Sequence, residues 1–330
     1  MVAERGPTGV RLVAIDERGD RSFVLVKPAV GMVRDTNPTI SPDDRWVVFA
    51  SSRGRPFDET NLWIAPLGVD AVPVQLTHGP AIDSHPTWTR DGKAIVYASA
   101  APSDGFDLWR LPIDRDGHPG AAVQLTRGRG HEVTPSVAPD GTIVFAEVTV
   151  LAAGQIESRL EELRPDGTTR PLTDGPADAS PAVSPDGTAI AFARPVVRGD
   201  NRDGDLWRLD RKTGAITRLL DLPLTDESGP VWSPDGRQVF ATSLLHKADG
   251  SPLFSSVIVV DLGEPTPRAR LLEDRAGAIP RLTPAIPHGR LDRGQLLGDP
   301  EYLPALARII AAALAEEASD ARSGHTPAPR

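Results

Sequence analysis

The sequence predicts an all-β protein, a six-bladed β-propeller, from three observations. A short motif recurs six times along the 330 residues, and its copies begin at Pro38, Pro86, Pro135, Pro181, Pro230 and Pro280. The copies are 48, 49, 46, 49 and 50 residues apart, a period typical of propeller blades. Helical periodicity is nearly absent before residue 299, which argues against α/β folds and helical solenoids.

Each repeat is predicted to form four short antiparallel strands, which is the number in a blade. The inner strand starts at the repeated proline and ends in a tight turn such as Ser184-Pro185-Asp186-Gly187. In that turn proline presets φ and glycine accepts a left-handed conformation. An apolar run such as Ala189 to Ala193 follows as the second strand. Segments such as Asp205 to Trp207 and Val123 to Thr126 indicate the third and fourth strands.

The sixth repeat departs from this pattern. Its turn, Thr283-Pro284-Ala285-Ile286, lacks the Asp-Gly pair. Residues 10–26 have the pattern of a strand, a turn and a second strand, so we expect this N-terminal segment to complete the last blade and close the ring. The propeller is therefore predicted to span residues 1–298, with inner strands that start near residues 38, 86, 135, 181, 230 and 280.

Residues 299–318 predict one C-terminal amphipathic helix. Asp299 and Pro300 suit its first turn, and Leu303, Leu306, Ile310 and Leu314 recur at helical spacing. The apolar stripe either packs on the thin sixth blade or docks a partner or a second chain. The tail, residues 319–330, is predicted to be disordered.

Composition narrows the classes of partner. The net charge of −9 argues against a nucleic-acid partner, which would require clustered lysine and arginine. No apolar run reaches the roughly 20 residues of a membrane helix, so membrane insertion is not expected. The N-terminus lacks the pattern of an export signal, which predicts a cytoplasmic location, with a periplasmic or secreted location as the alternative if a leader was removed. The oligomeric state stays open.

The repeat is similar to a known family. The pattern of Pro230-Val-Trp-Ser-Pro-Asp-Gly236, followed in other copies by an Asp-Leu-Trp strand, resembles the TolB-type β-propeller repeat, which also occurs in relatives of prolyl oligopeptidase. The resemblance covers about residues 10–298 and implies a six-bladed propeller that engages protein partners. The six tryptophans lie within the repeats and indicate blade packing, although Trp88 and Trp232, on inner strands, could instead line the channel.

An acidic residue stands three positions before the repeated proline in five of the six copies. These residues are Asp35, Asp83, Glu132, Asp178 and Glu227, and Gly277 takes the sixth place. One interpretation is that each carboxylate accepts hydrogen bonds from its own loop. The other is an acidic collar at the channel mouth that attracts cations or basic side chains. The two can hold together.

Two histidines raise the alternative of a divalent metal. His85 precedes Pro86, His131 precedes Glu132, and with Asp83 and Glu132 they would supply nitrogen and oxygen ligands for zinc or manganese. Because these residues belong to different blades, solvated or loop-bonded histidines are the simpler interpretation, and no cofactor is expected.

The sequence contains no G-x-S-x-G elbow, H-E-x-x-H helix or Walker loop. We therefore expect a non-enzymatic module that binds a protein or peptide at the acidic channel mouth, through the five carboxylates with His85 and His131. Two alternatives remain: a metal-dependent hydrolase, lactonase or lyase with its site in the channel, and a structural subunit that docks through the C-terminal helix.

Overall fold

A computed structural model describes residues 2–6, 9–15, 22–24, 26–27, 29, 31–57, 59–101, 105–128, 130–151, 155–198, 201–220, 225–246, 252–263, 268–271 and 282–283. In these ranges the regular structure is entirely β-strand, and no helix of membrane-spanning length and hydropathy occurs among them. The predicted helix at 299–318 and the tail at 319–330 lie outside the described residues. The all-β prediction is confirmed.

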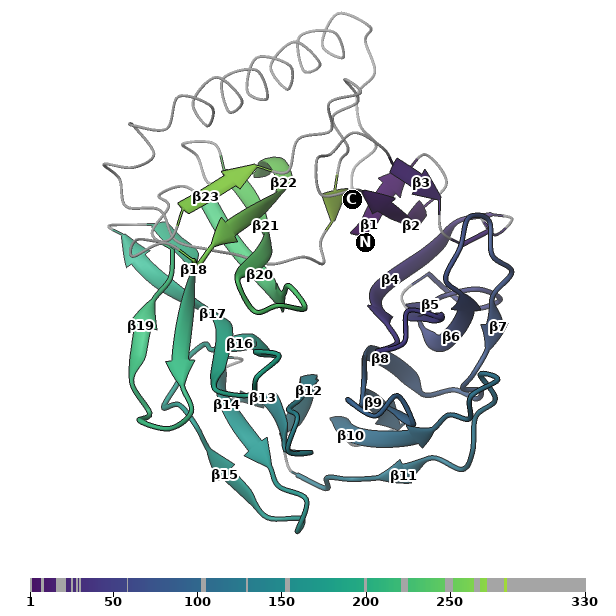
Figure 1. The fold of residues 1–330 in the computed structure, drawn as a ribbon, viewed down its shortest axis with the longest axis horizontal. Helices are drawn as coiled ribbons and strands as arrows, with labels where there is room; N and C mark the ends of the chain where they lie inside the picture. Colours follow the sequence, from purple (N-terminus) through teal and green to yellow (C-terminus); the bar gives the residue numbers. More distant parts are fainter. Residues whose placement is uncertain are drawn as a thin grey trace, which may run out of the picture.

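The strands form a ring of four-stranded antiparallel blades around a central channel, with one inner strand per blade nearest the axis (Figure 1). The first blade is β4 (Val33–Ile40), β5 (Trp46–Ser51), β6 (Asn61–Pro66) and β7 (Val74–Gln75); the second is β8 (Ile82–Trp88), β9 (Ala94–Ala101), β10 (Gly105–Pro112) and β11 (Val123–Gln124). The third is β12 (His131–Val137), β13 (Ile143–Val150), β14 (Ile156–Leu163) and β15 (Thr169–Pro171). The fourth is β16 (Ala179–Val183), β17 (Ala189–Arg198), β18 (Asn201–Asp210) and β19 (Ile216–Arg218); the fifth is β20 (Thr225–Trp232), β21 (Gln238–His246), β22 (Pro252–Asp261) and β23 (Arg268–Leu271).

The predicted count of six blades is wrong for the described residues, which form five. The remaining strands are β1 (Val2–Gly6), β2 (Gly9–Ile15), β3 (Ser22–Val24) and β24 (Leu282–Thr283). They pair antiparallel in the order β24-β1-β2-β3, so the N-terminal segment does join the sixth repeat. However, β2 also pairs parallel with β4, which merges this group with the first blade into one eight-stranded sheet. Of the sixth repeat, the structure describes only Leu282 and Thr283, which form β24.

The turns after the inner strands of the fourth and fifth blades have the predicted chemistry. In the fourth blade the Ser184 hydroxyl donates to Asp186 Oδ1 at 2.6 Å and accepts from the Ala189 amide at 2.9 Å, while Gly187 has a φ of +74°. Ser233 and Asp235 make the same 2.6 Å bond in the fifth blade. A side chain thus holds the hairpin closed, and this short local pattern is enough to place it.

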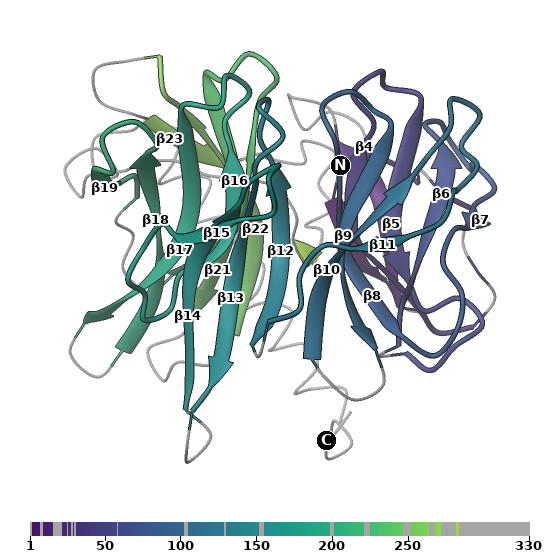
Figure 2. The same cartoon turned by 90° about the horizontal axis from the view of Figure 1, so that it is seen from below.

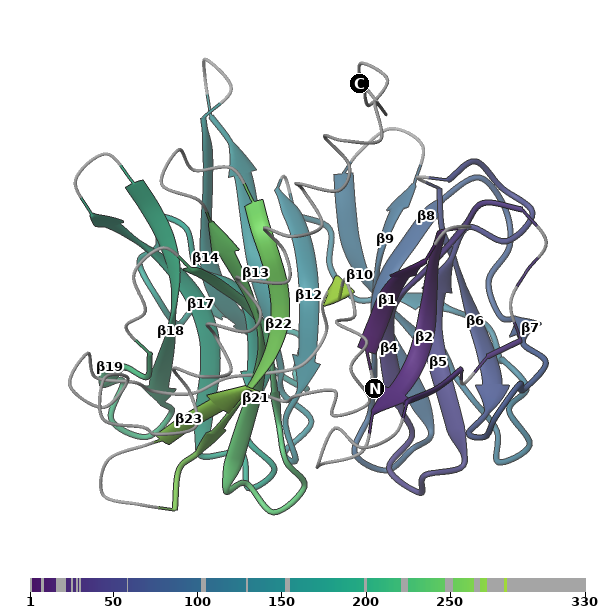
Figure 3. The same cartoon turned by 90° about the horizontal axis from the view of Figure 1, so that it is seen from above.

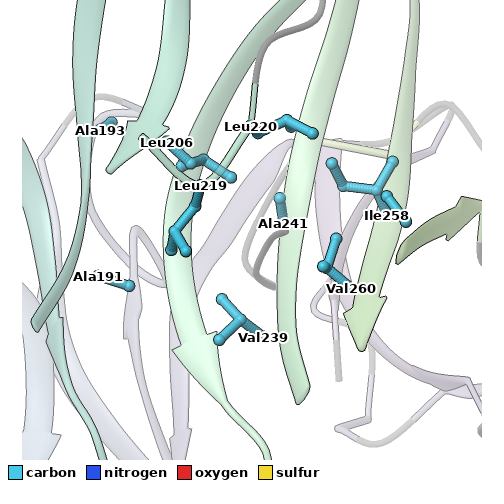
Figure 4. Close-up of a cluster of buried hydrophobic side chains, with 10 residues drawn as sticks. Ala191, Ala193, Leu206, Leu219, Leu220, Val239, Ala241, Ile258 and Val260 are labelled. Carbon is cyan, nitrogen blue, oxygen red and sulfur yellow. The ribbon is translucent and has the colours of Figure 1, made fainter. Parts of the chain in front are cut away.

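Hydrophobic clusters between neighbouring blades form the core. Figure 4 shows one of them, in which Leu206 of β18 packs with Val239 and Ala241 of β21 and Ile258 of β22. Trp88 is 6% exposed in the corresponding cluster between the first two blades. Trp232 packs on the cluster of Figure 4, and its indole nitrogen donates to the Ala182 carbonyl at 3.0 Å. Both tryptophans therefore join blades, and the alternative that they line the channel is not supported.

Candidate functional site

The five acidic residues lie at the same end of their blades because each inner strand is built in the same way. Directly before the repeated proline, every inner strand carries a bulge residue in the left-handed region, with φ between +49° and +61°: Asn37, His85, Thr134, Ser180 and Gly229. The strand register shifts at each of these bulges. Proline has no N–H to donate to the ladder, so the pairing is interrupted there and resumes on either side.

The five carboxyl side chains are buried. The exposed fractions are 3% for Asp35, 3% for Asp83, 4% for Glu132, 0% for Asp178 and 1% for Glu227. Each side chain lies among atoms of its own second strand or of the preceding blade. Because burying a charge is costly unless it is paired or neutralised, the partners of each group decide its state.

Asp178 is held by an arginine. Arg194 lies on the neighbouring strand directly after Ala193, which pairs with Ala179. It donates through Nε to Asp178 Oδ1 at 2.5 Å and through Nη2 to Oδ2 at 2.8 Å. The hydrogen bond to Asp178 raises the pKa of Arg194. The guanidinium also lies over the rings of Phe192 and Trp207, with its carbon 5.3 Å and 5.5 Å from their centroids. This two-point pairing supplies a counter-charge to the buried Asp178 side chain.

Asp35 has a similar arrangement in the first blade. Its Oδ2 accepts from Arg53 Nη2 at 2.5 Å, and its Oδ1 accepts from the hydroxyl of Ser51, the paired residue on β5, at 2.6 Å. Burial raises the pKa of Asp35, and the bonds from Arg53 and Ser51 oppose this shift. Arg53 also donates to the Lys27 carbonyl at 3.0 Å, so the pair holds the chain segment that leads into the blade.

Asp83 joins the first two blades through neutral donors. Its Oδ2 accepts from Thr77 Oγ1 at 2.5 Å and from Asn61 Nδ2 at 3.2 Å, and both donors belong to the preceding blade. Its backbone amide also donates to the Thr60 carbonyl at 2.8 Å. Burial raises the pKa of Asp83 despite these donors and the Ser99 hydroxyl.

Glu132 faces other acids. Its Oε2 accepts from Thr126 Oγ1 at 3.1 Å, and its partner across the strand pair is Glu147. Burial, together with Asp107 of the preceding blade and Glu147, raises the pKa of Glu132 to about 7. A methyl group on Gly128 would collide with the Glu132 carboxyl group, so the absence of a side chain there makes room for it.

Glu227 is the most isolated of the five. Its Oε1 accepts from Ser243 Oγ at 2.8 Å, whereas its Oε2 is buried without a hydrogen-bond partner. Burial raises the pKa of Glu227 well above its ordinary value, and the nearby Asp205 and Asp226 add to the shift. Asp205 itself is ion-paired with Arg218. These surroundings favour the protonated form of Glu227 over the carboxylate.

The two histidines lie in different settings. His85 is the bulge residue of β8, where burial and the charge of Arg34 lower its pKa to about 4. Nδ1 of His131 accepts from the Phe106 amide at 3.3 Å. Within the described ranges, no three His, Asp or Glu side chains gather in a way that could hold a metal ion. The structure therefore does not bring His85, His131, Asp83 and Glu132 together as one ligand set.

Each of the five acids and its hydrogen-bond partners form a carboxyl junction. Threonines at the end of the fourth strands belong to these junctions, and they were not identified from the sequence. The Thr77, Thr126 and Thr173 hydroxyls accept from the amides of Leu62, Leu108 and Leu160 at 2.8–2.9 Å. Thr77 and Thr126 also donate to the next carboxyl group. A signal was present, because a Leu-Thr pair precedes Asp83, Glu132 and Asp178 by five or six residues.

Together, the ring of antiparallel blades and the repeated carboxyl junction define a β-propeller assembled from one repeated unit. A family model described as the TolB beta propeller domain matches residues 24–198, more than half of the chain. The chain belongs to this family, and the resemblance seen in the repeat is confirmed.

Relatives of this chain support the same family. An uncharacterized protein of Agrobacterium fabrum is 27% identical over 226 residues, which cover 66% of this chain and 73% of that protein. The Tol-Pal system protein TolB of Francisella tularensis subsp. mediasiatica is 26% identical over 267 residues, which cover 68% of this chain and only 59% of that protein. A solved structure of a candidate TolB protein from Agrobacterium tumefaciens aligns with a TM-score of 0.61 at 20% identity, over 78% of this chain and 86% of that one.

Proposed function

We propose that this chain is a non-enzymatic propeller module that binds a protein or peptide on the face where the inner strands begin. Membership of the TolB propeller family carries the proposal. Relatives in that family are named as proteins of the Tol-Pal system, so the first partners to test are the other Tol-Pal proteins of the same organism. Fold alone does not assign function, because propellers host enzymes as well as binding modules.

The five carboxyl groups are buried below this face and hold its strands in place. They are at most 4% exposed, and their hydrogen bonds tie the start of each inner strand to the second strand or to the preceding blade. A binding surface needs loops that are held in place before the partner arrives, since ordering them on binding would weaken affinity. In this proposal the collar formed by Asp35, Asp83, Glu132, Asp178 and Glu227 positions that surface and adds negative potential to it.

The experiment is a titration of the purified chain with each purified Tol-Pal protein by calorimetry at two salt concentrations. We expect one of them to bind with a Kd that rises with salt, because the chain carries a net charge of −9. Absence of binding to any of these proteins at both salt concentrations would refute the proposed function.

Three substitutions separate the charge of the collar from its supporting role. Asp83→Asn and Glu132→Gln keep the side-chain shape and remove a carboxyl group, and Glu227→Gln is the matched control because burial disfavours the charged form of Glu227 most strongly. If the charge contributes, the first two variants bind more weakly and with a shallower salt dependence, while the third is unchanged. Equal binding by all three folded variants would leave the collar with a supporting role only.

A further inference from the structure

The hairpin of β13 and β14 extends beyond the neighbouring blades. Its last strand pair is Val150 with Ile156, and the Leu151 amide donates to the Gln155 carbonyl at 2.7 Å just past it. Figures 2 and 3 show these two strands reaching farther along the channel axis than the adjacent strands. The tip stands at the same end of the blade as Glu132, because His131 pairs with Val148. It therefore projects from the face assigned above to partner binding.

The end of this hairpin is apolar and open to solvent. Val150 is 57% exposed and Ile156 is 66% exposed. Side chains alternate along a strand, so both lie on the same side of the hairpin as Val144 and Leu160, which pack against the fourth blade. Farther out, Ser158 pairs with Ala177 in the loop that leads into that blade. The apolar strip thus extends from the core, past this loop, to solvent-exposed residues at the end of the hairpin.

The loop beside the strip adds proline and acid. Pro176 is exposed, and its carbonyl accepts from the Ser158 amide at 2.9 Å, which fixes it against the hairpin. The side chain of Asp174 is 97% exposed. Arg194 lies 4.0 Å from Asp174, but it makes both of its short bonds to the buried Asp178. Glu157, the next residue after Ile156, is also exposed, and strand alternation places it on the opposite side of the hairpin end.

We propose that Val150, Ile156 and Pro176, with Asp174 beside them and Glu157 on the opposite side of the hairpin end, form a hairpin-tip surface that anchors the partner. The segment it fits is a protein strand or loop with apolar side chains flanked by lysine or arginine. Apolar side chains would cover the valine and isoleucine, and the flanking cations would meet the two carboxylates. This inference rests on the proposed function and adds the chemistry of the partner.

The same acids favour a protein segment over a lipid surface. Amphipathic elements that lie on membranes place lysine and arginine beside their apolar side chains, because the headgroups they meet are anionic. The hairpin-tip surface has aspartate and glutamate in those places, so an anionic bilayer would repel it.

The test uses the full chain and two fluorescent peptides of equal length, measured by anisotropy. One interleaves leucine and phenylalanine with lysine and arginine, and the other replaces the cations with aspartate and glutamate. We expect the basic peptide to bind at least about tenfold more tightly than the acidic one. The double variant Val150→Thr with Ile156→Thr should lose about tenfold in affinity, because threonine keeps the β-branched shape but is more polar.

Matched controls are available elsewhere on the surface. Val74 and Val123 are 63% and 55% exposed on the outer strands β7 and β11, so Val74→Thr with Val123→Thr should change the affinity by less than about twofold. Asp174→Asn with Glu157→Gln should reduce affinity for the basic peptide and flatten its salt dependence. Asp116→Asn changes an acid in an exposed turn of the second blade, so it should leave the affinity and its salt dependence unchanged.

The outcomes separate this inference from the proposed function. If a Tol-Pal protein or the basic peptide binds but the hairpin-tip variants bind equally well, the inference fails and the proposed function stands. If the hairpin-tip variants lose binding to phosphatidylglycerol vesicles and not to the peptide, the surface is a lipid site and the inference fails. If neither peptides nor Tol-Pal proteins bind, both fail together.

Discussion

The junctions at Asp178 and Glu227 occupy the same place in neighbouring repeats but differ in chemistry. Both carboxyl groups stand at the start of an inner strand, and neither is more than 1% exposed. Asp178 meets Arg194 on the neighbouring strand and receives two charged hydrogen bonds. Glu227 meets Ser243 at the corresponding position, which donates to Oε1 at 2.8 Å, and no cation faces it in that place.

The difference shows that the repeat places an acid without deciding its partners. In the fourth blade a guanidinium opposite the acid compensates for the lost hydration of a carboxylate. A serine cannot do this, and burial raises the pKa of Glu227. In these two repeats the residue 16 positions after the acid differs, and replacing either member tests its effect.

The largest expected effect is that of Arg194→Ala. It leaves the fully buried Asp178 without its counter-charge, which should lower the free energy of unfolding by about 3–5 kcal/mol at pH 7. Urea titrations followed by tryptophan fluorescence measure the change. Arg53→Ala is the matched control, and it should cost less because Ser51 still donates to Asp35. Equal losses for the two variants would contradict the dependence on a single partner.

A smaller contrast is expected between Asp178→Asn and Glu227→Gln. The first removes the charged partner of a half-buried arginine and should cost about 2 kcal/mol. The second replaces an acid whose pKa is raised by burial with an amide of nearly the same shape and should change stability by less than about 1 kcal/mol. Unfolding titrations at pH 7 compare them. A larger loss for Glu227→Gln than for Asp178→Asn would show that Glu227 is ionised.

The last prediction is a pH dependence at Glu132, whose pKa is raised from 4.5 to about 7. A raised carboxyl pKa means that the folded state holds the proton more tightly than the unfolded state. Its contribution to stability is therefore fully present below pH 4.5 and is lost as the pH rises to about 7. Glu132→Gln should flatten the thermal-stability profile over this window, measured as Tm against pH. An unchanged slope would show that Glu132 is ionised throughout.

Much of the fold could be predicted because its signals are local. The turn at Ser184 to Gly187 needs only four adjacent residues, and it recurs with the predicted geometry in the structure. The number of blades could not be predicted in the same way. The sixth repeat lacks that turn, and the pairing of β24 with β1 and of β2 with β4 joins segments distant in sequence.

The place of the five acids in their blades could be predicted from the sequence, whereas their hydrogen-bond partners could not. The repeat register places all five acids at one end of their blades, and the structure agrees. The partners of Asp83 come from the preceding blade, and those of Asp178 and Glu227 come from the next strand along the chain. No motif indicated these contacts, because they depend on how strands pair and blades pack. The same limit applies to His85 and His131, which lie in different settings.

The sequence by itself determined the repeating blade, the turn that closes its inner hairpin and the place of one acid per repeat, because each depends on residues close together in the chain. Only the tertiary structure decided how many blades the described residues form and which partners each acid meets. Those outcomes depend on desolvation and on partners supplied by other strands, which reach each carboxyl group only when the ring is assembled.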